Sequence, residues 1–431
     1  MLNIYKLGTA DCDGFLQKLK VRAQSPAKEI VDTVTAILDD VKTRGDEAVL
    51  EYTEKFDKVR LSSDTLEMSK EDLKKAAGGV DEKLYKTMEK AAENIRKYHS
   101  KQLRQSFFDT SDTNKTVGMR ISAVKRAGIY VPGGSAAYPS SVLMNCIPAK
   151  VAGVSEIIMT TPLRDGKIPA AVAAAALISG VDRVFLCGGA QAIAALAYGT
   201  QTIPQVDVIA GPGNIFVATA KRLVYGSVEI DMIAGPSEVL VVADKNANPE
   251  YIAADLLSQA EHDAIASSVL VTDSYELAQK VDKALAEQLA KLERNEIAQK
   301  SVENYGAAIV CENMDKVFEV ANAVAPEHLE VLTQNPFADL SKVENAGSIF
   351  LGEYSPEPLG DYFAGTNHVL PTNGTSRFAS ALSVDTFIKK SGVIFYTEKG
   401  LSEYKDDIIR FAESEGLTAH ANSVRVRFCK E

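Results

Sequence analysis

The sequence lacks several features that mark secreted and membrane proteins. Its 431 residues include only five cysteines, which form no Cys-x-x-Cys pair. This argues against a disulfide framework and against a thiolate zinc site. The longest hydrophobic run, 170–178, is too short to span a bilayer and predicts a packed helix. The N-terminus has no basic segment followed by an apolar core, so we expect no signal peptide.

Acidic residues outnumber basic ones, 58 to 47. The formal net charge is −11 and no long basic run occurs, so we expect a cytoplasmic protein that binds neither nucleic acid nor an anionic membrane. The composition, 46% hydrophobic and 24% charged, is that of an ordinary globular protein, and the length suffices for two or three domains. Because thiolate pairs are missing, a metal site would have to use imidazole, carboxylate and carboxamide ligands.

The order of predicted elements indicates an α/β protein. Up to about residue 100 the sequence predicts helices, including 29–44 and 82–101. Beyond residue 120, short apolar segments alternate with Gly/Pro turns and helices, which predicts parallel sheets flanked by helices. So many strands favour two sheets, divided near Gly235-Pro236. The expected strands are 126–131, 156–160, 183–186, 206–209, 239–242, 269–271, 308–310 and 348–351.

The C-terminal end resembles an appendage more than a third core. From about residue 383 the sequence becomes polar and predicts a strand at 393–396, a charged amphipathic helix at 402–414 and a basic tail. Glu415 and His420 lie on either side of Gly416, which we expect to end that helix. A catalytic role for His420 would require this tail to reach a core, of the same subunit or of another.

Three glycine-rich loops follow predicted strands, at 130–135, 187–191 and 210–214. None is a G-x-G-x-x-G motif, and a P-loop is absent. Small residues still allow a phosphate to approach the backbone at a helix N-terminus. One such loop is more often only a tight turn. Three in one predicted sheet indicate a nucleotide site, without saying which nucleotide binds.

The chain has only five histidines, and four of them lie in its C-terminal two fifths. Each of these four has a carboxylate or carboxamide within a few residues: His262, His328, His368 and His420. Any single one could be an ordinary core or surface residue. Together they predict a metal site with N and O ligands and acid–base chemistry beside it.

One helix is predicted to carry part of this site. Asn248-Pro249 is a preferred start, with Asn as N-cap and Pro at the first helical position. Asp255, Gln259 and His262 follow at i, i+4 and i+7, which places them on one stripe. We therefore expect Gln259 and His262 to reach one cation and Asp255 to orient an imidazole. Glu261 is a rival ligand, but on a helix it would project roughly 100° away from His262.

Two further segments carry candidate site residues. Glu327-His328 follows a proline at a predicted loop-to-helix junction, and two adjacent side chains that diverge suit two separate proton-transfer roles. The segment 360–368 is polar and flanked by glycine, so we expect it to present Asp361 and His368 to a cleft.

With these motifs the chain resembles the histidinol dehydrogenase family over nearly its whole length. The motifs that carry the resemblance are 130–134, 140–145, 147–153, 188–199, 211–214, 230–238, 255–262, 326–330, 367–372 and 415–420. The resemblance implies a zinc- and NAD-dependent oxidation of L-histidinol to L-histidine in two steps, through the aldehyde. It also implies an α/β fold of two incomplete Rossmann-like units with small N- and C-terminal appendages.

The resemblance also implies roles for individual residues. Glu327 and His328 would be the acid–base pair. The zinc ligands would be Gln259, His262, Asp361 and His420. Substrate contacts would include these four with His328, Ser237, His368 and Glu415, and the NAD contacts would be Tyr130, Gln191 and Asn214.

The family fold further implies a homodimer whose tails are exchanged, which would bring His420 and Glu415 to the partner's site. The expected segments are an N-terminal appendage (1–24), a first α/β domain (25–129 with 236–381), an NAD-binding domain (130–235) and the exchanged tail (382–431). Ile233, Asn373 and Cys146 depart from the residues usual in the family, which puts loop conformation in doubt and leaves the proposed ligands intact.

Two other functions stay open at this point. Cys146 or Cys187 could serve as the nucleophile of a cysteine-dependent aldehyde dehydrogenase, although neither has a histidine nearby in sequence. A non-catalytic protein that binds a nucleotide or zinc is the second alternative, because fold alone does not fix function. The Glu327-His328 pair argues against it, since such a protein has no need of two proton carriers.

Overall fold

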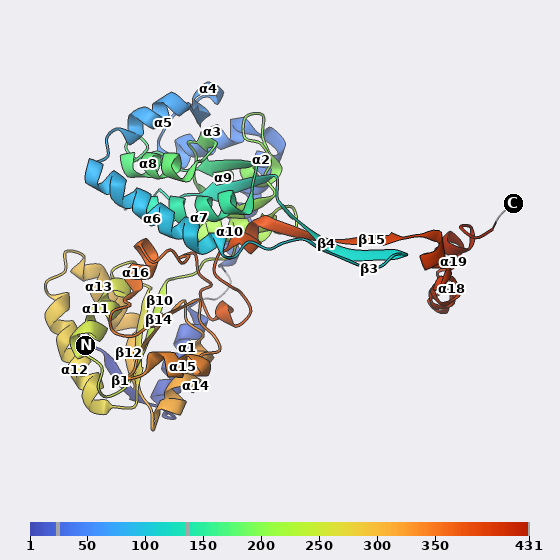
Figure 1. Ribbon diagram of the computed structural model, residues 1–431. Coiled ribbons are helices and arrows are strands. Elements are labelled where there is room, and N and C mark those ends of the chain that lie inside the picture. Colours follow the sequence, from blue (N-terminus) through green and yellow to red (C-terminus); the bar gives the residue numbers. More distant parts are fainter. Residues whose placement is uncertain (23–25, 134–137, 430–431) are drawn as a thin grey trace. The chain divides into compact units, whose positions relative to one another are not determined.

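The computed structural model describes residues 1–22, 26–133 and 138–429 (Figure 1). These residues form two units. The larger one comprises Met1–Gln102 and Val124–Phe387, and the smaller one comprises Leu103–Ala123 and Ile388–Glu431. Gly134 and Ser135 of the first glycine-rich loop lie outside the described residues, as does the expected boundary between residues 24 and 25.

The larger unit contains a six-stranded parallel sheet, here called the first sheet, in the order β1-β12-β11-β10-β13-β14. Its strands are β1 (Asn3–Lys6), β10 (Glu238–Ala243), β11 (Ser267–Thr272), β12 (Gly306–Val310), β13 (His328–Leu332) and β14 (Ser348–Leu351). Helices cover both faces, as apolar strands require.

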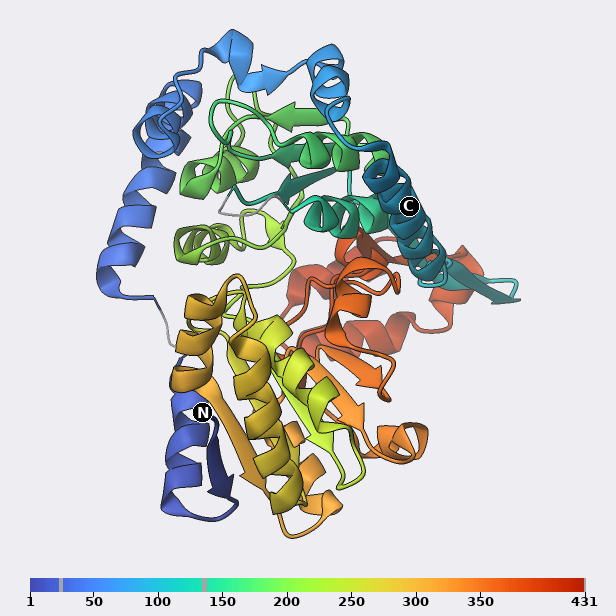
Figure 2. The ribbon, with the colours of Figure 1, turned by 90° about the vertical axis from the view of Figure 1, so that its left-hand side faces the viewer.

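Each face of the first sheet has its own hydrophobic core. On one face lie α11 (Pro249–Ala260), α12 (Tyr275–Leu289) and α13 (Asn295–Tyr305), which Figure 2 shows in yellow-green to gold. On the other face lie α1 (Ala10–Val21) and α14 (Met314–Val324). The sheet is therefore a buried central layer, and its edges and strand ends are the places left for chemistry.

A second six-stranded sheet has the order β2-β7-β6-β5-β8-β9 and is parallel except for β2. Its strands are β2 (Glu67–Met68), β5 (Arg126–Tyr130), β6 (Glu156–Thr160), β7 (Arg183–Phe185), β8 (Val208–Ala210) and β9 (Glu229–Ile230). One core joins it to α2 (Lys28–Arg44), α3 (Asp46–Asp57), α9 (Gly189–Tyr198) and α10 (Ile215–Val224). The short α4 (Ser63–Leu66) precedes β2.

A further layer of helices packs together beside the second sheet: α5 (Lys70–Ala77), α6 (Glu82–Ser100), α7 (Pro139–Ala152) and α8 (Ala170–Ser179). Helix α8 is the predicted packed helix, and its alanines 173–176 are fully buried. Within the part of the chain that the structure describes, no helix combines the length and the apolar character needed to cross a membrane.

The segments divide between the sheets differently from the expected domain boundaries. All eight expected strands are present, and the chain leaves the second sheet at Ile230 and resumes the first at Glu238, close to the expected division. Helices α2 to α6, which we expected with 236–381, instead pack beside the second sheet. The reason is the apolar stripe of α2 (Val34, Ile37, Leu38, Val41), which fills that core. Strand β1 pairs with β12 and so extends the first sheet.

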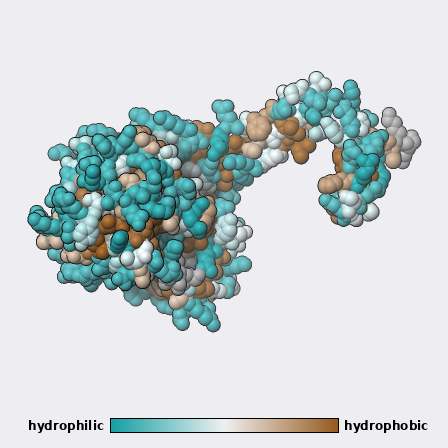
Figure 3. Space-filling view, turned by 90° about the horizontal axis from the view of Figure 1, so that it is seen from below, coloured by the Kyte–Doolittle hydropathy of each residue, from teal (hydrophilic) through white to brown (hydrophobic). Residues whose placement is uncertain are grey.

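The smaller unit is an antiparallel sheet, in the order β15-β4-β3, followed by short helices. Its elements are β3 (Phe107–Asp112), β4 (Lys115–Ala123), β15 (Ile388–Tyr396), α17 (Glu398–Ser402), α18 (Lys405–Ser414) and α19 (Thr418–Arg425). Gly416 has φ of 71° and ends α18 as expected. Figure 3 shows hydrophobic side chains on the surface of this unit. Its exposed hydrophobic residues include Ile394 (80% exposed) and Phe411 (71% exposed).

Candidate active site

His328 begins β13 and Glu327 directly precedes it, so the predicted loop-to-helix junction is wrong. Strand β13 runs between β10 and β14, with His328 opposite Val239 and Ser348. All five residues of the strand are buried, including the polar His328 and Glu330. Polar residues in a buried strand hide the apolar pattern of a strand, so the acidic segment after Pro326 resembled a helix start. The chain entering β14 passes so close that a Cβ on Gly347 would be 2.6 Å from the Glu327 carbonyl oxygen.

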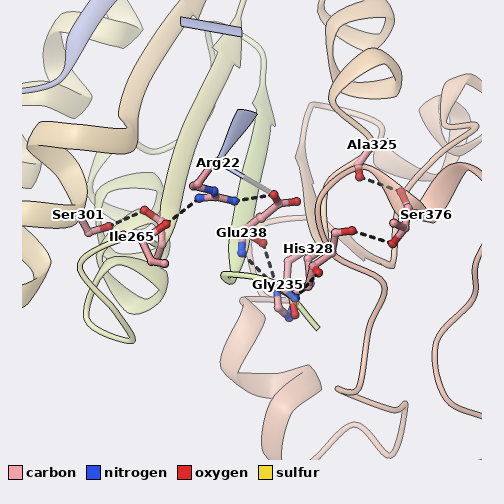
Figure 4. Close-up of polar contacts among 12 residues, drawn as sticks. Arg22, Gly235, Glu238, Ile265, Ser301, Ala325, His328 and Ser376 are labelled. Atoms are coloured by element: carbon pink, nitrogen blue, oxygen red, sulfur yellow. Dashed lines mark hydrogen bonds and ion pairs between the residues drawn. The ribbon is translucent and has the colours of Figure 1, made fainter. Parts of the chain in front are cut away.

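The backbone of Glu238 contacts both predicted acid–base residues, and Figure 4 shows Glu238 beside His328. Its N–H donates to Glu327 Oε2 at 2.9 Å, and His328 Nδ1 lies 3.0 Å from its carbonyl oxygen. Because a carbonyl can only accept, we assign the imidazole proton to Nδ1, which leaves Nε2 with a free lone pair. His328 Nε2 is buried without a hydrogen-bond partner among the described residues and lies 3.8 Å from Asp361 Oδ1.

Burial shifts the pKa of both groups, in opposite directions. It raises the pKa of Glu327 well above its usual range, and the nearby carboxylates raise that pKa further, while the Glu238 N–H opposes the shift. Burial lowers the pKa of His328, against the opposing effect of the Asp361 charge. At neutral pH His328 is therefore a neutral imidazole, able to accept a proton at Nε2.

A candidate cation site lies next to His328. The ligand atoms of His262, Glu357 and Asp361 all lie within 4.8 Å of one another. Gln259 is buried, and with its amide turned so that nitrogen donates, it bonds both carboxylate oxygens of Glu357, at 2.8 and 3.1 Å. The structure thus brings together three predicted ligands, Gln259, His262 and Asp361. It adds Glu357, which the sequence reasoning missed.

Helix α11 begins as predicted but ends earlier than the predicted stripe requires. Asn248 caps it by accepting from the Glu250 N–H, with Pro249 at the first position. The helix ends at Ala260, so His262 lies in the following turn, exposed, and not on the helical stripe.

Asp255 does not take the predicted role of orienting an imidazole. Its carboxyl group hydrogen-bonds to Glu330 of β13, and burial raises the pKa of Asp255 to about 6. The pair is therefore a buried carboxyl–carboxyl contact between α11 and β13, in which protonation of one partner relieves the repulsion.

The loop at 360–368 folds back on itself around Asp361, which lies in the short α16 (Glu357–Tyr362). His368 Nδ1 lies 3.2 Å from the Asp361 carbonyl oxygen and 4.0 Å from its Oδ1, and His368 is largely buried. His328 and His368 therefore both approach the Asp361 carboxylate. Ser237 precedes β10 and accepts a hydrogen bond from the Ser267 N–H through its carbonyl oxygen.

His99 was not predicted to belong to any site, yet it supports this loop. The side chain is completely buried, with Nδ1 2.8 Å from Gln102 Oε1 and Nε2 3.4 Å from Asn367 Nδ2. Asn367 also donates to the Met144 carbonyl at 2.7 Å. The residue before His368 is therefore held by α6 and α7, a contact between sequence-distant segments that local patterns do not reveal.

These groups gather at the amino ends of the strands of the first sheet. His328 and Glu238 begin β13 and β10, and His262 follows the end of α11, which runs back to that edge. A cavity of about 360 Å³ lies beside them. Helices α6 and α7 line one side of it, and residues near His262 and Asp361 line the other. Its lining includes Met88, Leu143, Glu261, His262, Arg294 and Asp361.

The second sheet brings together the three predicted NAD contacts, at the carboxyl ends of its strands. Tyr130 ends β5, and its hydroxyl accepts from the Gly189 N–H at 3.1 Å. Gln191 is buried with neither amide atom hydrogen-bonded within the described chain. Asn214 caps α10 by accepting from two backbone N–H groups. Gly211, at φ of 121°, approaches Tyr130 so closely that a Cβ would be 2.1 Å from its carbonyl oxygen.

The other two predicted residues lie in the smaller unit. His420 is on α19 and Glu415 is the C-cap of α18, and both are exposed. The larger unit therefore contains all of the predicted site residues except these two.

Comparison with known proteins identifies the family. The model of the histidinol dehydrogenase family matches residues 20–428. The chain is 53% identical over 429 residues to histidinol dehydrogenase from Clostridium acetobutylicum, which covers 99% of both chains. The chain belongs to the histidinol dehydrogenase family.

Further relatives agree with this assignment. Histidinol dehydrogenase from Bacillus subtilis is 52% identical over 410 residues, 95% of this chain and 96% of that one. The crystal structure of histidinol dehydrogenase from Elizabethkingia anophelis matches with a TM-score of 0.92 at 38% identity, covering 99% of this chain and 98% of the other. The predicted family, dehydrogenase class and α/β fold are confirmed.

Within a histidinol dehydrogenase fold, the three departures are accommodated. Asn373 has φ of 58°, a left-handed conformation that Asn tolerates better than other residues with a side chain. Cys146 is buried within α7, and Ile233 is exposed.

The cysteine-based alternative has no support in the structure. Cys146 and Cys187 are completely buried, and burial raises the pKa of the Cys146 thiol to about 12 and raises that of Cys187 as well. A nucleophilic cysteine needs an accessible thiolate. Both residues therefore act as apolar packing groups.

We expect Cys146→Ser and Cys187→Ala each to retain most of the wild-type turnover with alcohol and with aldehyde. Steady-state rates would be compared with thermal unfolding, since each change alters a packed core. Loss of aldehyde oxidation by several orders of magnitude in a folded variant, as when a nucleophile is removed, would restore the cysteine mechanism.

Proposed function

We propose that the chain oxidises L-histidinol through L-histidinaldehyde to L-histidine, with zinc in the site and two NAD consumed. The observation that carries this proposal is the arrangement around His328. A buried neutral imidazole has a free Nε2 that lies 3.8 Å from Asp361, and Asp361 belongs to the candidate cation site. With Glu327 adjacent, two proton acceptors adjoin one cation site, as an alcohol oxidation followed by aldehyde hydration requires.

The zinc ligands we propose are Gln259, His262 and Asp361, with His420 of the partner subunit. Imidazole nitrogen and carboxylate or amide oxygen are donors that suit zinc. The contact with Glu357 supports Gln259 in this role, because an amide whose nitrogen donates to Glu357 turns its oxygen away as a free ligand. Bound zinc would orient the imidazole and amine nitrogens of the substrate.

His328 and Glu327 divide the proton transfers. In the first oxidation His328 Nε2 takes the hydroxyl proton, and the Glu238 carbonyl holds the proton on Nδ1. The aldehyde must add water before a second oxidation. Glu327 accepts the proton of that water, and its raised pKa makes the ionised carboxylate a stronger base. His328 acts again when the hydrate loses its hydroxyl proton.

The nucleotide site we propose uses Tyr130, Gln191 and Asn214. Gln191 supports it most directly, because its two buried amide atoms have no partner within the described chain and are available to a ligand. Gly211 has no room for a side chain, because a Cβ would lie 2.1 Å from the Tyr130 carbonyl oxygen, so the ends of β5 and β8 lie close together beside Asn214. Bound NAD supplies the hydride acceptor for both oxidations.

Substrate contacts that we propose besides the zinc ligands and His328 are Ser237, His368 and Glu415. His368 is supported by its position 4.0 Å from Asp361 Oδ1. Ser237 is supported by its place immediately before Glu238, whose backbone contacts both acid–base groups. Glu415, in the smaller unit, would be supplied by the partner subunit.

The chain is proposed to act as a homodimer in the cytoplasm, with the smaller unit packed on a second copy. The support is the apolar surface of this unit, including Phe107 (57% exposed), Ile394 and Phe411. A patch of this kind is stabilised by burial against another surface. All five cysteines are free, as the reducing cytoplasm favours.

An assay of NADH formation from L-histidinol, with and without a metal chelator, tests the proposed function. We expect turnover that yields two NADH per L-histidinol, is lost with the chelator and returns on adding zinc. A protein that only binds a nucleotide or zinc would form no NADH under any condition.

Replacement of one proposed ligand should remove metal and activity together. We expect His262→Asn to lose bound zinc and to lose more activity than the roughly 10–100-fold typical of disturbing an outer-shell partner. Zinc content by elemental analysis and turnover would be measured on the same samples. Asp263→Asn, an exposed neighbour outside the ligand group, is the matched control and should keep both. Full zinc content in His262→Asn would contradict the assignment.

A further inference from the structure

The first residue of β10, Glu238, fixes the geometry of both acid–base groups through its backbone. Its N–H donates to Glu327 Oε2 at 2.9 Å, and its carbonyl oxygen lies 3.0 Å from His328 Nδ1. These main-chain groups move together with the residue that bears them. A shift of Glu238 would therefore disturb the orientation of Glu327 and the proton position of His328 at once.

The side chain of Glu238 is held by Arg22, which follows α1 (Figure 4). Arg22 Nη2 lies 2.5 Å from Glu238 Oε1, and the two side chains are only 2% and 9% exposed. Arg22 Nη1 donates to the Ile265 carbonyl at 2.9 Å, and the guanidinium lies over the Tyr305 ring. A single planar group thus ties the start of β10 to the loop before β11 and to the end of α13.

The ion pair is better suited to positioning than to stability. A buried ion pair contributes little compared with well-packed apolar side chains of the same volume, because both charges lose their hydration. Its two charges do favour one geometry strongly in a low-dielectric interior. Neither Arg22 nor Glu238 lines the cavity beside the candidate cation site. Their side chains therefore act on the acid–base residues through the backbone of Glu238 and through their charges, which lie close enough to influence Glu327.

We propose that Arg22 and Glu238 form a positioning pair that sets the tautomer of His328 and the orientation of Glu327. The pair fixes the Glu238 carbonyl, which keeps the imidazole proton on Nδ1 and leaves Nε2 free to accept the substrate's proton. The same restraint aims the Glu238 N–H at Glu327. Its link to catalysis rests on the proposed function, whereas its link to the tautomer does not.

Removing the guanidinium should lower kcat and leave KM nearly unchanged. In Arg22→Met we expect kcat to fall roughly 10–100-fold, the usual cost of losing an orienting partner, with KM for L-histidinol and bound zinc little altered. Arg22→Lys should recover part of the loss, because an ammonium group can pair with Glu238 without the planar fork that also reaches Ile265. A KM increase with unchanged kcat would contradict a positioning role.

Lys18→Met is the matched control. Lys18 lies on α1, over the same Tyr305 ring, and bonds the Asn304 carbonyl, but it makes no contact with Glu238. We expect wild-type kcat. An equal loss in Lys18→Met would show that α1 packing, and not the ion pair, matters.

The unpaired carboxylate left in Arg22→Met could destabilise the fold, so a double variant separates the two effects. Arg22→Met with Glu238→Gln removes both charges of the pair, so neither is left buried without its partner. We expect its thermal unfolding temperature to return toward that of the wild type while kcat stays low. Wild-type kcat in this double variant would overturn the proposal, because the positional restraint would then be dispensable.

The tautomer itself can be measured without turnover. The chain has only five histidines, so ¹⁵N-histidine labelling of the zinc-loaded protein gives few signals, and His328→Asn identifies the one of interest. We expect Nδ1–H with unprotonated Nε2 in the wild type, and a mixture of tautomers in Arg22→Met and in the double variant. An unchanged tautomer in both would refute the positioning role. A wild type that fails to oxidise L-histidinol would refute the proposed function instead.

Discussion

Glu327→Gln is expected to oxidise L-histidinol to the aldehyde at a rate near that of the wild type and then to stall. His328→Asn is expected to slow both oxidations. The reason lies in the two environments. In the proposed mechanism, the neutral His328 Nε2 accepts a proton in each oxidation, whereas Glu327 only takes a proton from water. Losses of roughly 10²–10⁴-fold are typical when a positioned general base is removed.

The rates would be measured with the alcohol and with the aldehyde as separate substrates. For Glu327→Gln, the retained rate with the alcohol also shows that the variant is folded. We expect Glu327→Gln to lose activity with the aldehyde only. Glu344→Gln, an exposed carboxylate before β14, is a matched control that should leave both rates unchanged. Equal impairment of Glu327→Gln with the two substrates would contradict the division of roles.

The position of these groups explains which parts of the site could be predicted from the sequence. Strands and helices with regular apolar spacing were predicted well: the strand at 156–160 and the cap at Asn248 are correct to the residue. β13 was missed, because a fully buried strand that carries His328 and Glu330 does not show the apolar run on which the prediction depends.

Contacts between distant segments could not be predicted at all. Glu357 joins the candidate cation site from a six-residue helix, and His99 supports Asn367 from α6. Arg22 and Glu238 are separated by more than two hundred residues, and neither has a sequence signal beyond its charge. Only folding at the amino ends of the first sheet brings these groups together, whereas strand-following glycine loops had drawn attention to the carboxyl ends.

Mixing two inactive variants is expected to restore activity if the site is shared between subunits. Each of His262→Asn and His420→Asn should be inactive alone, since each removes one proposed ligand. His262 lies in the larger unit and His420 in the smaller one. If the smaller unit of one subunit completes the site of the other, every heterodimer contains one site with all ligands intact and one site with both lesions.

Equal mixing under conditions that allow subunit exchange should return about a quarter of the wild-type activity, because random pairing makes half of the dimers mixed and each has one intact site of two. NADH formation and zinc content would both be measured, with heterodimers verified by differently tagged subunits. His262→Asn mixed with His328→Asn is the matched control: both lesions lie in the larger unit, so no pairing yields an intact site. Verified heterodimers of His262→Asn and His420→Asn without activity would mean that each site is built within a single chain, which would leave the exposed apolar surface of the smaller unit to some other contact.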